Sequence, residues 1–257
     1  METKNNNIAE PKSSQEKEIV VEIANMKKSF GSKNVLKDIS FNIYRGENLV
    51  VLGKSGSGKS VMIKCIVALL EPDEGKTLVF GQNIFELKNK ELNLMRKKIG
   101  FLFQSGALYD SMSVRENLAF PLRDSKDMSK DEISKLIEEA LDDVGLADTI
   151  DKMPSELSGG MRKRLGLART LILKPEIILY DEPTTGLDPI TSKEISELIL
   201  KVQKEHNTTS IIITHDIACA KLTANRMIVF KDGLISTEGT FAELEKSEDE
   251  WVRSFFE

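Results

Sequence analysis

The sequence predicts an α/β fold, with a mostly parallel sheet flanked by helices, an antiparallel β subdomain and an inserted helical subdomain. Two observations predict this class. Short runs rich in apolar residues at 48–52, 177–180 and 210–214 indicate strands buried on both faces, and helical patterns separate them. Residues 18–24 and 39–43 instead alternate apolar with polar or charged residues, as strands with one solvated face do.

The composition is that of a soluble globular protein, and the length suits either one large α/β unit with a subdomain or two compact domains. Of its 257 residues, 40% are hydrophobic and 30% are charged. The formal net charge of -5 implies no general polyanion-binding face, so we expect no nucleic-acid partner. The basic clusters at 96–98 and 162–164 are predicted to be solvated surface, and Cys65 and Cys219 to be buried small hydrophobes in a reducing compartment.

We expect no membrane anchor within this sequence. No apolar run approaches the length that spans a bilayer. Residues 1–17 are rich in Asn, Lys, Ser and Glu, which predicts a mobile arm and not a secretory signal. We therefore expect a cytoplasmic protein that another chain would have to hold at a membrane.

The first turn carries an aromatic residue, Phe30, between the strands predicted at 18–24 and 39–43. Two interpretations are open. Phe30 is either a core residue of the small antiparallel sheet or a ring on which adenine stacks, and the sequence favours neither.

A glycine-rich loop follows the strand at 48–52 and precedes a helix predicted over 61–70. Strand, glycine loop, Lys-Ser and helix form the phosphate-binding P-loop pattern. Glycines let backbone N–H groups converge on an anion, and the helix N-terminus adds its positive dipole end. Lys59 reaches the outer phosphates and the Ser60 hydroxyl ligates Mg²⁺. The predicted nucleotide-binding residues are Gly53, Lys54, Ser55, Gly56, Ser57, Gly58, Lys59 and Ser60.

Strands are next predicted at 76–80 and 99–103, and the second ends abruptly at Gln104. Residues 104–156 then change character. Helical patterns over 114–119, 130–144 and 147–150 predict a helical subdomain inserted into the α/β core.

Ser158, Gly159 and Gly160 begin a helical run over 162–173. A serine and two glycines at a helix start form a second possible anion cradle, although this pattern is more often only a helix cap.

Two carboxylates, Asp181 and Glu182, stand at the carboxyl end of the strand at 177–180, where ligands collect in open α/β sheets. Asp181 is placed to hold Mg²⁺, and Glu182 to orient and deprotonate an attacking water. Asp188 is predicted to cap the helix over 190–205, a structural role that would still allow it to lie near the nucleotide. His215 follows the strand at 210–214, either as a core histidine or as a contact to the γ-phosphate.

Near the C-terminus, Asp232-Gly233 predicts a hairpin turn, and residues 245–257 are predicted to form a tail helix. Its apolar stripe either covers the protein's own core or docks on a partner. The stripe consists of Trp251, Val252, Phe255 and Phe256.

From about residue 20 to 244, these motifs in this order resemble the ATP-binding-cassette (ABC) ATPase family, which implies an ATPase domain over 18–244. The resemblance implies ATP and Mg²⁺ as cofactors, with adenine stacked on Phe30. It implies a catalytic set of Lys59, Gln104, Glu182 and His215, with Mg²⁺ held by Ser60, Gln104 and Asp181. It also implies a head-to-tail homodimer, in which Ser158, Gly159, Gly160 and Asp188 serve the second copy's nucleotide.

One position departs from the family's usual pattern: Met161 stands where a glutamine is usual. This methionine, with residues 103–109 and 116–122, resembles the ATPases of mammalian-cell-entry (MCE) type lipid transporters. That resemblance implies an integral permease at the inner membrane, contacted through Leu108 and Tyr109, and an MCE-domain partner. The alternatives are the ATPase of another ABC importer or lipoprotein-release system, or a soluble ABC protein without a transport role.

Overall fold

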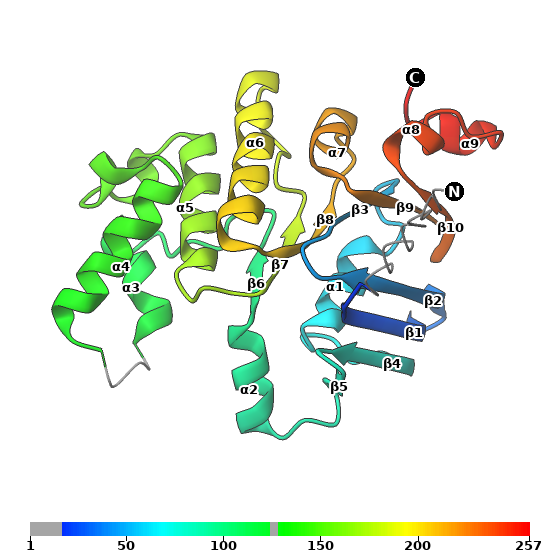
Figure 1. Ribbon diagram of the computed structural model, residues 1–257, viewed down its shortest axis with the longest axis horizontal. Helices are drawn as coiled ribbons and strands as arrows, with labels where there is room; N and C mark the ends of the chain where they lie inside the picture. The colour runs from blue at the N-terminus through cyan, green and yellow to red at the C-terminus, as the bar shows by residue number, and fades with distance from the viewer. Residues whose placement is uncertain (1–16, 124–127) are drawn as a thin grey trace, which may run out of the picture.

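The computed structural model describes residues 17–123 and 128–257, so the predicted arm at 1–17 lies, apart from its last residue, outside the described residues. A six-stranded sheet forms the centre of the molecule (Figure 1). Its order from one edge to the other is β10 (Leu234–Gly239), β9 (Arg226–Lys231), β3 (Asn48–Gly53), β8 (Thr209–Ile213), β7 (Ile177–Asp181) and β6 (Ile99–Leu102). All neighbours from β9 to β6 pair in parallel, and only β10 is antiparallel to its neighbour.

A second, four-stranded sheet is antiparallel throughout, in the order β2 (Lys33–Tyr44), β1 (Ile19–Phe30), β4 (Glu74–Val79) and β5 (Gln82–Asn83). Strands β1 and β2 extend well beyond the predicted 18–24 and 39–43. The register of β1 shifts between Ile23 and Met26, and Asn25 within this bulge has a positive φ of 51°. The bulge breaks the apolar alternation, which hides the second half of the strand from a sequence pattern.

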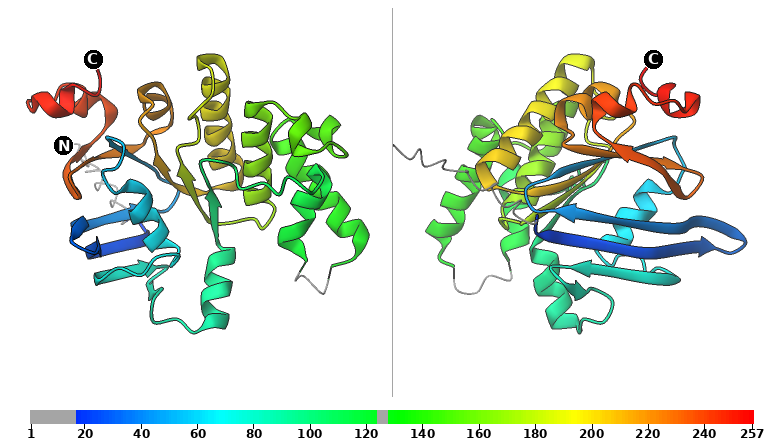
Figure 2. Two further views of the ribbon diagram at one scale, coloured as in Figure 1. Left: turned by 180° about the vertical axis from the view of Figure 1, so that it is seen from behind. Right: turned by 45° about the vertical axis from the view of Figure 1, so that its right-hand side comes forward.

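Helix α1 (Lys59–Ile66) lies between the two sheets (Figure 2). Its Met62, Ile63 and Ile66 are fully buried in one core cluster with residues of both sheets. The helix stops short of the predicted residue 70 because Ala68 adopts a left-handed φ of 55°. The P-loop is thereby fixed at the start of a helix that both sheets hold in place.

The helices of the predicted insert lie at the opposite end of the molecule from β1 and β2 (Figure 1). The described part of residues 104–156 contains α3 (Val114–Ala119), α4 (Lys130–Asp143) and short 3₁₀ turns. Helix α5 (Gly159–Leu171) packs against α3 and α4 on one side and contacts β6 on the other. It therefore connects the insert to the central sheet.

Three further helices complete the core unit. Helix α2 (Asn89–Lys97) precedes β6 and was not predicted, whereas α6 (Pro189–His206) and α7 (Ile217–Thr223) follow β7 and β8. Cys65 and Cys219 are both buried, which confirms their prediction as small core residues.

The predicted tail helix is much shorter than residues 245–257. Within residues 245–257 only α9 (Glu250–Arg253) is helical, and α8 (Phe241–Leu244) ends just before them. Val252 is 1% exposed and belongs to the main core cluster, against which Trp251, Phe255 and Phe256 also pack. The apolar stripe therefore covers the protein's own core.

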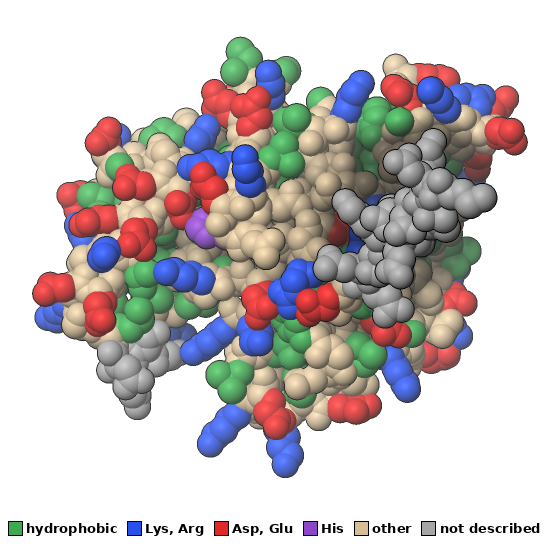
Figure 3. Space-filling view, in the orientation of Figure 1, with side chains coloured by type: hydrophobic (Ala, Val, Ile, Leu, Met, Phe, Trp, Pro, Cys, Tyr) green, Lys and Arg blue, Asp and Glu red, His purple; other side chains and the backbone are tan. Residues whose placement is uncertain are grey.

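The surface carries charges of both signs. On the face shown in Figure 3, acidic and basic side chains are interspersed over the described part of the molecule. Among residues 17–123 and 128–257, no helix is both long and apolar enough to cross a membrane.

Candidate functional site

A cleft of about 560 Å³ opens where the two sheets meet α1. It brings together predicted residues from segments far apart in the chain. Lys33, Val35 and Val61, which were not predicted, also line it. The predicted residues that line it are Phe30, Ser55, Gly56, Gly58, Lys59, Ser60, Gln104, Glu182 and His215. Phe30 is 48% exposed, which excludes the core interpretation and leaves its ring available to a ligand.

Close packing requires glycine at two P-loop positions, Gly53 and Gly58. A Cβ on Gly53 would lie 2.6 Å from the carbonyl oxygen of Phe230, and one on Gly58 would lie 2.9 Å from that of Val35. Gly58 also has a φ of 108°, a conformation that other residues rarely adopt. Any side chain at these positions would push the loop away from the sheet and disrupt the anion cradle.

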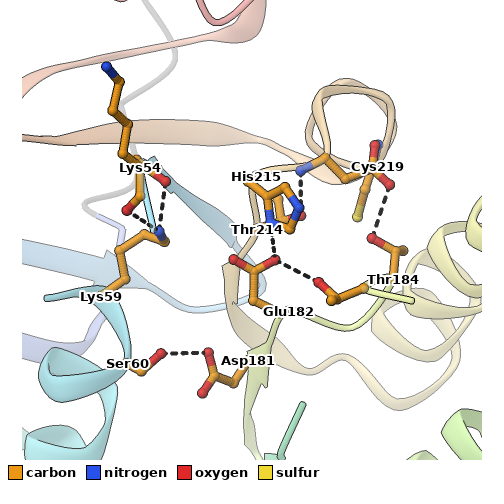
Figure 4. A network of polar contacts seen from close by, with 12 residues as sticks. Lys54, Lys59, Ser60, Asp181, Glu182, Thr184, Thr214, His215 and Cys219 are labelled. Atoms are coloured by element: carbon orange, nitrogen blue, oxygen red, sulfur yellow. Dashed lines mark hydrogen bonds and ion pairs between the residues drawn. The ribbon is translucent and has the colours of Figure 1, made fainter. Parts of the chain in front are cut away.

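The Lys59 side chain is hydrogen-bonded to the backbone of its own P-loop. Only 5% exposed, it donates from Nζ to the carbonyl oxygens of Gly53 at 2.7 Å and Lys54 at 3.1 Å (Figure 4). Burial lowers the pKa of Lys59, and the charges of Glu182 and Asp181 oppose that shift. A phosphate would give this buried ammonium a charged partner in place of neutral carbonyls.

Asp181 and Ser60 contact each other at the base of the cleft. The Ser60 hydroxyl donates to Oδ1 of Asp181 at 3.0 Å (Figure 4). Burial is the largest influence on Asp181 and raises its pKa. The hydroxyl, the carboxylate and the carbonyl oxygen of the Gln104 side-chain amide can each offer an oxygen ligand, the kind of ligand that Mg²⁺ prefers. The residues present therefore fit the predicted metal.

Glu182 and His215 form a pair across neighbouring strand ends. Oε2 of Glu182 lies 2.7 Å from Nδ1 of His215 and accepts a second hydrogen bond from the Thr185 hydroxyl at 3.1 Å. The His215 side chain is 63% exposed, which excludes the interpretation as a core histidine. Glu182 has a positive φ of 53°, a strained conformation for a residue other than glycine.

The second predicted cradle does not line the cleft. Ser158 caps α5, and its hydroxyl oxygen accepts a hydrogen bond from the Met161 N–H at 3.2 Å. A Cβ on Gly160 would lie 2.5 Å from Cγ2 of Thr191, so a larger residue would separate α5 from α6. Ser158 and Gly159 are exposed, and the cap interpretation is correct. A role towards another chain stays a prediction.

Asp188 also does not line the cleft. It caps α6 and accepts hydrogen bonds from the backbone N–H groups of Ile190 and Thr191, each at 3.0 Å. The hydrogen bond from the Thr191 hydroxyl, with these N–H groups, keeps the pKa of Asp188 below its usual value. The structural role of Asp188 is thus settled, and its approach to a nucleotide stays a prediction.

One polar residue near the site was predicted wrongly. Lys163, in a basic cluster predicted to be solvated, is only 7% exposed. Its Nζ donates to the carbonyl oxygen of Gln104 and to that of Glu182 at 3.3 Å. Helical spacing could have predicted this burial. Gly166 and Leu167, three and four residues after Lys163, lie on the buried face of α5, and residues at this spacing share one face of a helix.

Residues 36–185 match the family described as ABC transporter. The chain is similar to the probable ribonucleotide transport ATP-binding protein mkl of Mycobacterium leprae, with 42% identity over 84% of this chain and 63% of that protein. The chain thus spans less than two thirds of the length of this relative and of its mycobacterial counterparts. It is 36% identical to the intermembrane phospholipid transport system ATP-binding protein MlaF of Haemophilus influenzae, over 92% of this chain and 89% of that protein.

Solved structures show the same fold. A dimeric structure of the ATP-binding cassette MJ0796, bound to ADP and Pi, has a TM-score of 0.78 and 35% identity, over 86% of this chain and 98% of that one. The structure of cbiO1 from Clostridium perfringens, part of the ABC transporter complex cbiONQ, has a TM-score of 0.81 and 31% identity over 93% of this chain and 98% of that one.

Proposed function

The chain belongs to the ABC transporter family and carries its ATPase domain, and we propose that it hydrolyses ATP to energise a separate membrane permease for phospholipid or another hydrophobic molecule. One observation carries the catalytic part of this proposal. The Glu182–His215 pair lines the same cleft as the P-loop and Gln104. A base, a phosphate cradle and an oxygen-rich metal site therefore converge on one volume.

Each residue has a defined task in hydrolysis. The ATP phosphates bind the P-loop N–H groups and the Lys59 ammonium, while the adenine stacks on Phe30. The Glu182 carboxylate accepts a proton from water, whose oxygen attacks the γ-phosphorus as the bond to the ADP oxygen breaks. His215 orients that carboxylate through Oε2. Mg²⁺, held by Ser60, Asp181 and Gln104, would neutralise charge on the phosphate oxygens.

A second copy of the chain completes the site in this proposal. Ser158 and Gly159 are exposed and lie away from the chain's own cleft, at the N-terminus of a helix of 13 residues. Unpaired N–H groups and the helix dipole favour an anion there. In a head-to-tail dimer, the γ-phosphate of the partner's ATP would be the anion that binds at this helix N-terminus. The similarity to MJ0796, whose solved structure is dimeric, supports this arrangement.

A hollow of about 190 Å³ beside Gln104 is the proposed docking place for a permease helix. Part of its lining is apolar and consists of Phe101, Phe103, Ala107, Pro121 and Leu173. The residues predicted for this contact, Leu108 and Tyr109, do not line the hollow. The exposed Tyr109 ring lies against Phe120, with centroids 4.6 Å apart. Movement at Gln104 would be transmitted directly to a helix seated in this hollow.

The lipid part of the proposal draws on the names of relatives. One is the phospholipid transport protein MlaF, and another is the chloroplastic protein TRIGALACTOSYLDIACYLGLYCEROL 3 of Arabidopsis thaliana, 38% identical over 93% of this chain and 73% of that protein. In this scheme the chain lies on the cytoplasmic face of the inner membrane, bound to a permease and an MCE-domain protein. A methionine import protein of Legionella pneumophila, MetN, is also 40% identical over 84% of this chain and 63% of that protein.

Affinity purification from native membranes tests the proposal. The expected result is co-purification of an integral membrane protein, with bound phospholipid detected by mass spectrometry. A permease that carries an amino acid instead would keep the transport role and exclude the lipid substrate. Recovery of no integral membrane protein would exclude transport.

A further inference from the structure

Lys163 joins three segments that the proposed reaction uses. It lies in α5, within two turns of the exposed Ser158 at the helix N-terminus. Its ammonium donates to the carbonyl oxygen of Gln104, which follows β6, and to that of Glu182, which follows β7. One side chain therefore fixes the main chain at two residues of the cleft relative to a single helix.

Close packing supports this connection. A Cβ on Gly166 would lie 3.0 Å from the carbonyl oxygen of Gly106, so α5 lies directly against the segment that begins at Gln104. Arg169, further along α5, donates from its guanidinium to the carbonyl oxygen of Ala107. Two cations of α5 thus hold both ends of residues 104–107.

The surroundings of Lys163 differ from those of a surface lysine. It is 7% exposed, and Asp181 and Glu182 favour its charged form against the burial that lowers its pKa. Glu182, whose carbonyl oxygen accepts from Lys163, has a positive φ of 53°. This strained backbone conformation persists only where neighbouring groups hold it in place. Lys163 does not line the nucleotide cleft.

We propose that Lys163 is a positioning residue for ATP hydrolysis, which holds the main chain of Gln104 and of Glu182 in fixed places relative to α5. The inference rests on the proposed ATPase activity. Because the ammonium contacts backbone carbonyls and not the nucleotide, its removal misplaces the Glu182 carboxylate without removing a contact to ATP. Loss of the Lys163 ammonium should therefore lower kcat and leave the affinity for ATP unchanged.

Substitution by methionine tests this directly, because it keeps the unbranched stem of the side chain and removes the donor. Lys163→Met should lower kcat about tenfold or more, while the Kd for a non-hydrolysable ATP analogue stays within about twofold of the parent value. Lys163→Arg keeps both charge and donors and should recover most of the lost turnover. Lys163→Gln keeps a donor without charge and should fall between the two.

Lys201 offers a matched control. It also donates from Nζ to a backbone carbonyl, that of Asp143 at 3.0 Å, but it joins α6 to α4 away from the cleft. Lys201→Met should keep the parent kcat. Melting temperatures of all variants, measured in parallel, separate a loss of turnover from a loss of fold.

The outcomes distinguish the inference from the function on which it rests. If the parent chain hydrolyses no ATP in any assembly, the proposed function fails first. If the parent is active and Lys163→Met turns over at the parent rate, or loses analogue binding as strongly as turnover, the positioning role is wrong. If Lys163→Met does not fold, the comparison of Lys163→Gln with Lys163→Arg decides, and equal kcat values in two folded proteins would refute the role.

Discussion

Oε2 of Glu182 lies 2.7 Å from Nδ1 of His215, so two side chains from the ends of β7 and β8 form one unit. These strands are neighbours in the parallel sheet, and their carboxyl ends meet at the same edge. The pair leaves one carboxylate oxygen of Glu182 engaged by His215 and Thr185. The other oxygen is the one available to accept a proton from water.

Glu182→Gln should bind ATP as the parent does and nearly stop hydrolysis. The amide keeps the shape of the carboxylate but cannot act as a base, so kcat should fall by about 10²–10⁴-fold. Single-turnover kinetics and binding of a non-hydrolysable analogue check this, and ATP should remain trapped in a dimer. Hydrolysis at the parent rate would show that Glu182 is not the base.

His215→Ala should lower kcat by less than Glu182→Gln does. The histidine positions a carboxylate whose second contact, from the Thr185 hydroxyl at 3.1 Å, remains in the variant. Combining His215→Ala with Thr185→Val should then reduce kcat more than the two single losses multiplied together. A double variant no worse than His215→Ala alone would show that Thr185 has no part in holding Glu182.

Lys59→Ala should weaken nucleotide binding and turnover together. The ammonium is the charge that meets the outer phosphates, and alanine removes it in both the bound state and the transition state. Isothermal titration with ATP and steady-state kinetics measure the two effects. Lys193→Ala, an exposed lysine of α6, is the control and should change neither. Unchanged affinity and turnover in Lys59→Ala would refute the P-loop assignment.

The residues that line the cleft could be predicted because each motif is local in sequence. Glycines, a lysine and a serine in the P-loop, and two carboxylates at a strand end, carry their chemistry in consecutive residues. Lys163 could not be predicted in the same way. Its acceptors are the backbone carbonyls of Gln104 and Glu182, which are 59 and 19 residues away and have no side-chain signal. Its basic neighbours suggested solvated surface.

In the fold, too, features with a local sequence pattern were predicted and features without one were missed. The buried parallel strands were predicted from apolar runs. Helix α2 was missed because Met95 is its only buried residue and most of its other residues are polar or charged. The second half of β1 was missed because a bulge at Asn25 breaks the alternation. Pairing with β2 and β4, and not a local pattern, holds the second half of β1 in the sheet.

Asp181→Asn should stabilise the nucleotide-free protein and abolish its response to Mg²⁺. Burial raises the pKa of Asp181, so ionisation costs more free energy in the folded state than in the unfolded state. The cost is absent below the ordinary value of 3.8, grows as the pH rises, and is complete above the folded pKa. Each kcal/mol recovered should raise Tm by roughly 2–4 °C in a chain of this size.

Thermal melts of Asp181→Asn and the parent at neutral pH and near pH 4 check this sign. The advantage of the variant should be larger at neutral pH, and Mg²⁺ should stabilise only the parent in the presence of ATP. An equal or lower Tm for the variant at neutral pH would mean that Asp181 is stabilising when ionised.

Ala107→Glu should separate the ATPase from its permease. Ala107 is exposed and lines the hollow beside Gln104, so a carboxylate there would lie against the apolar surface proposed to receive a permease helix. The variant should bind ATP normally but recover much less integral membrane protein from native membranes. Leu234→Glu introduces the same charge on β10, at the opposite edge of the sheet from β6, and should recover the parent amount. If Ala107→Glu recovers as much membrane protein as Leu234→Glu, the permease docks elsewhere, and movement at Gln104 reaches it by another route.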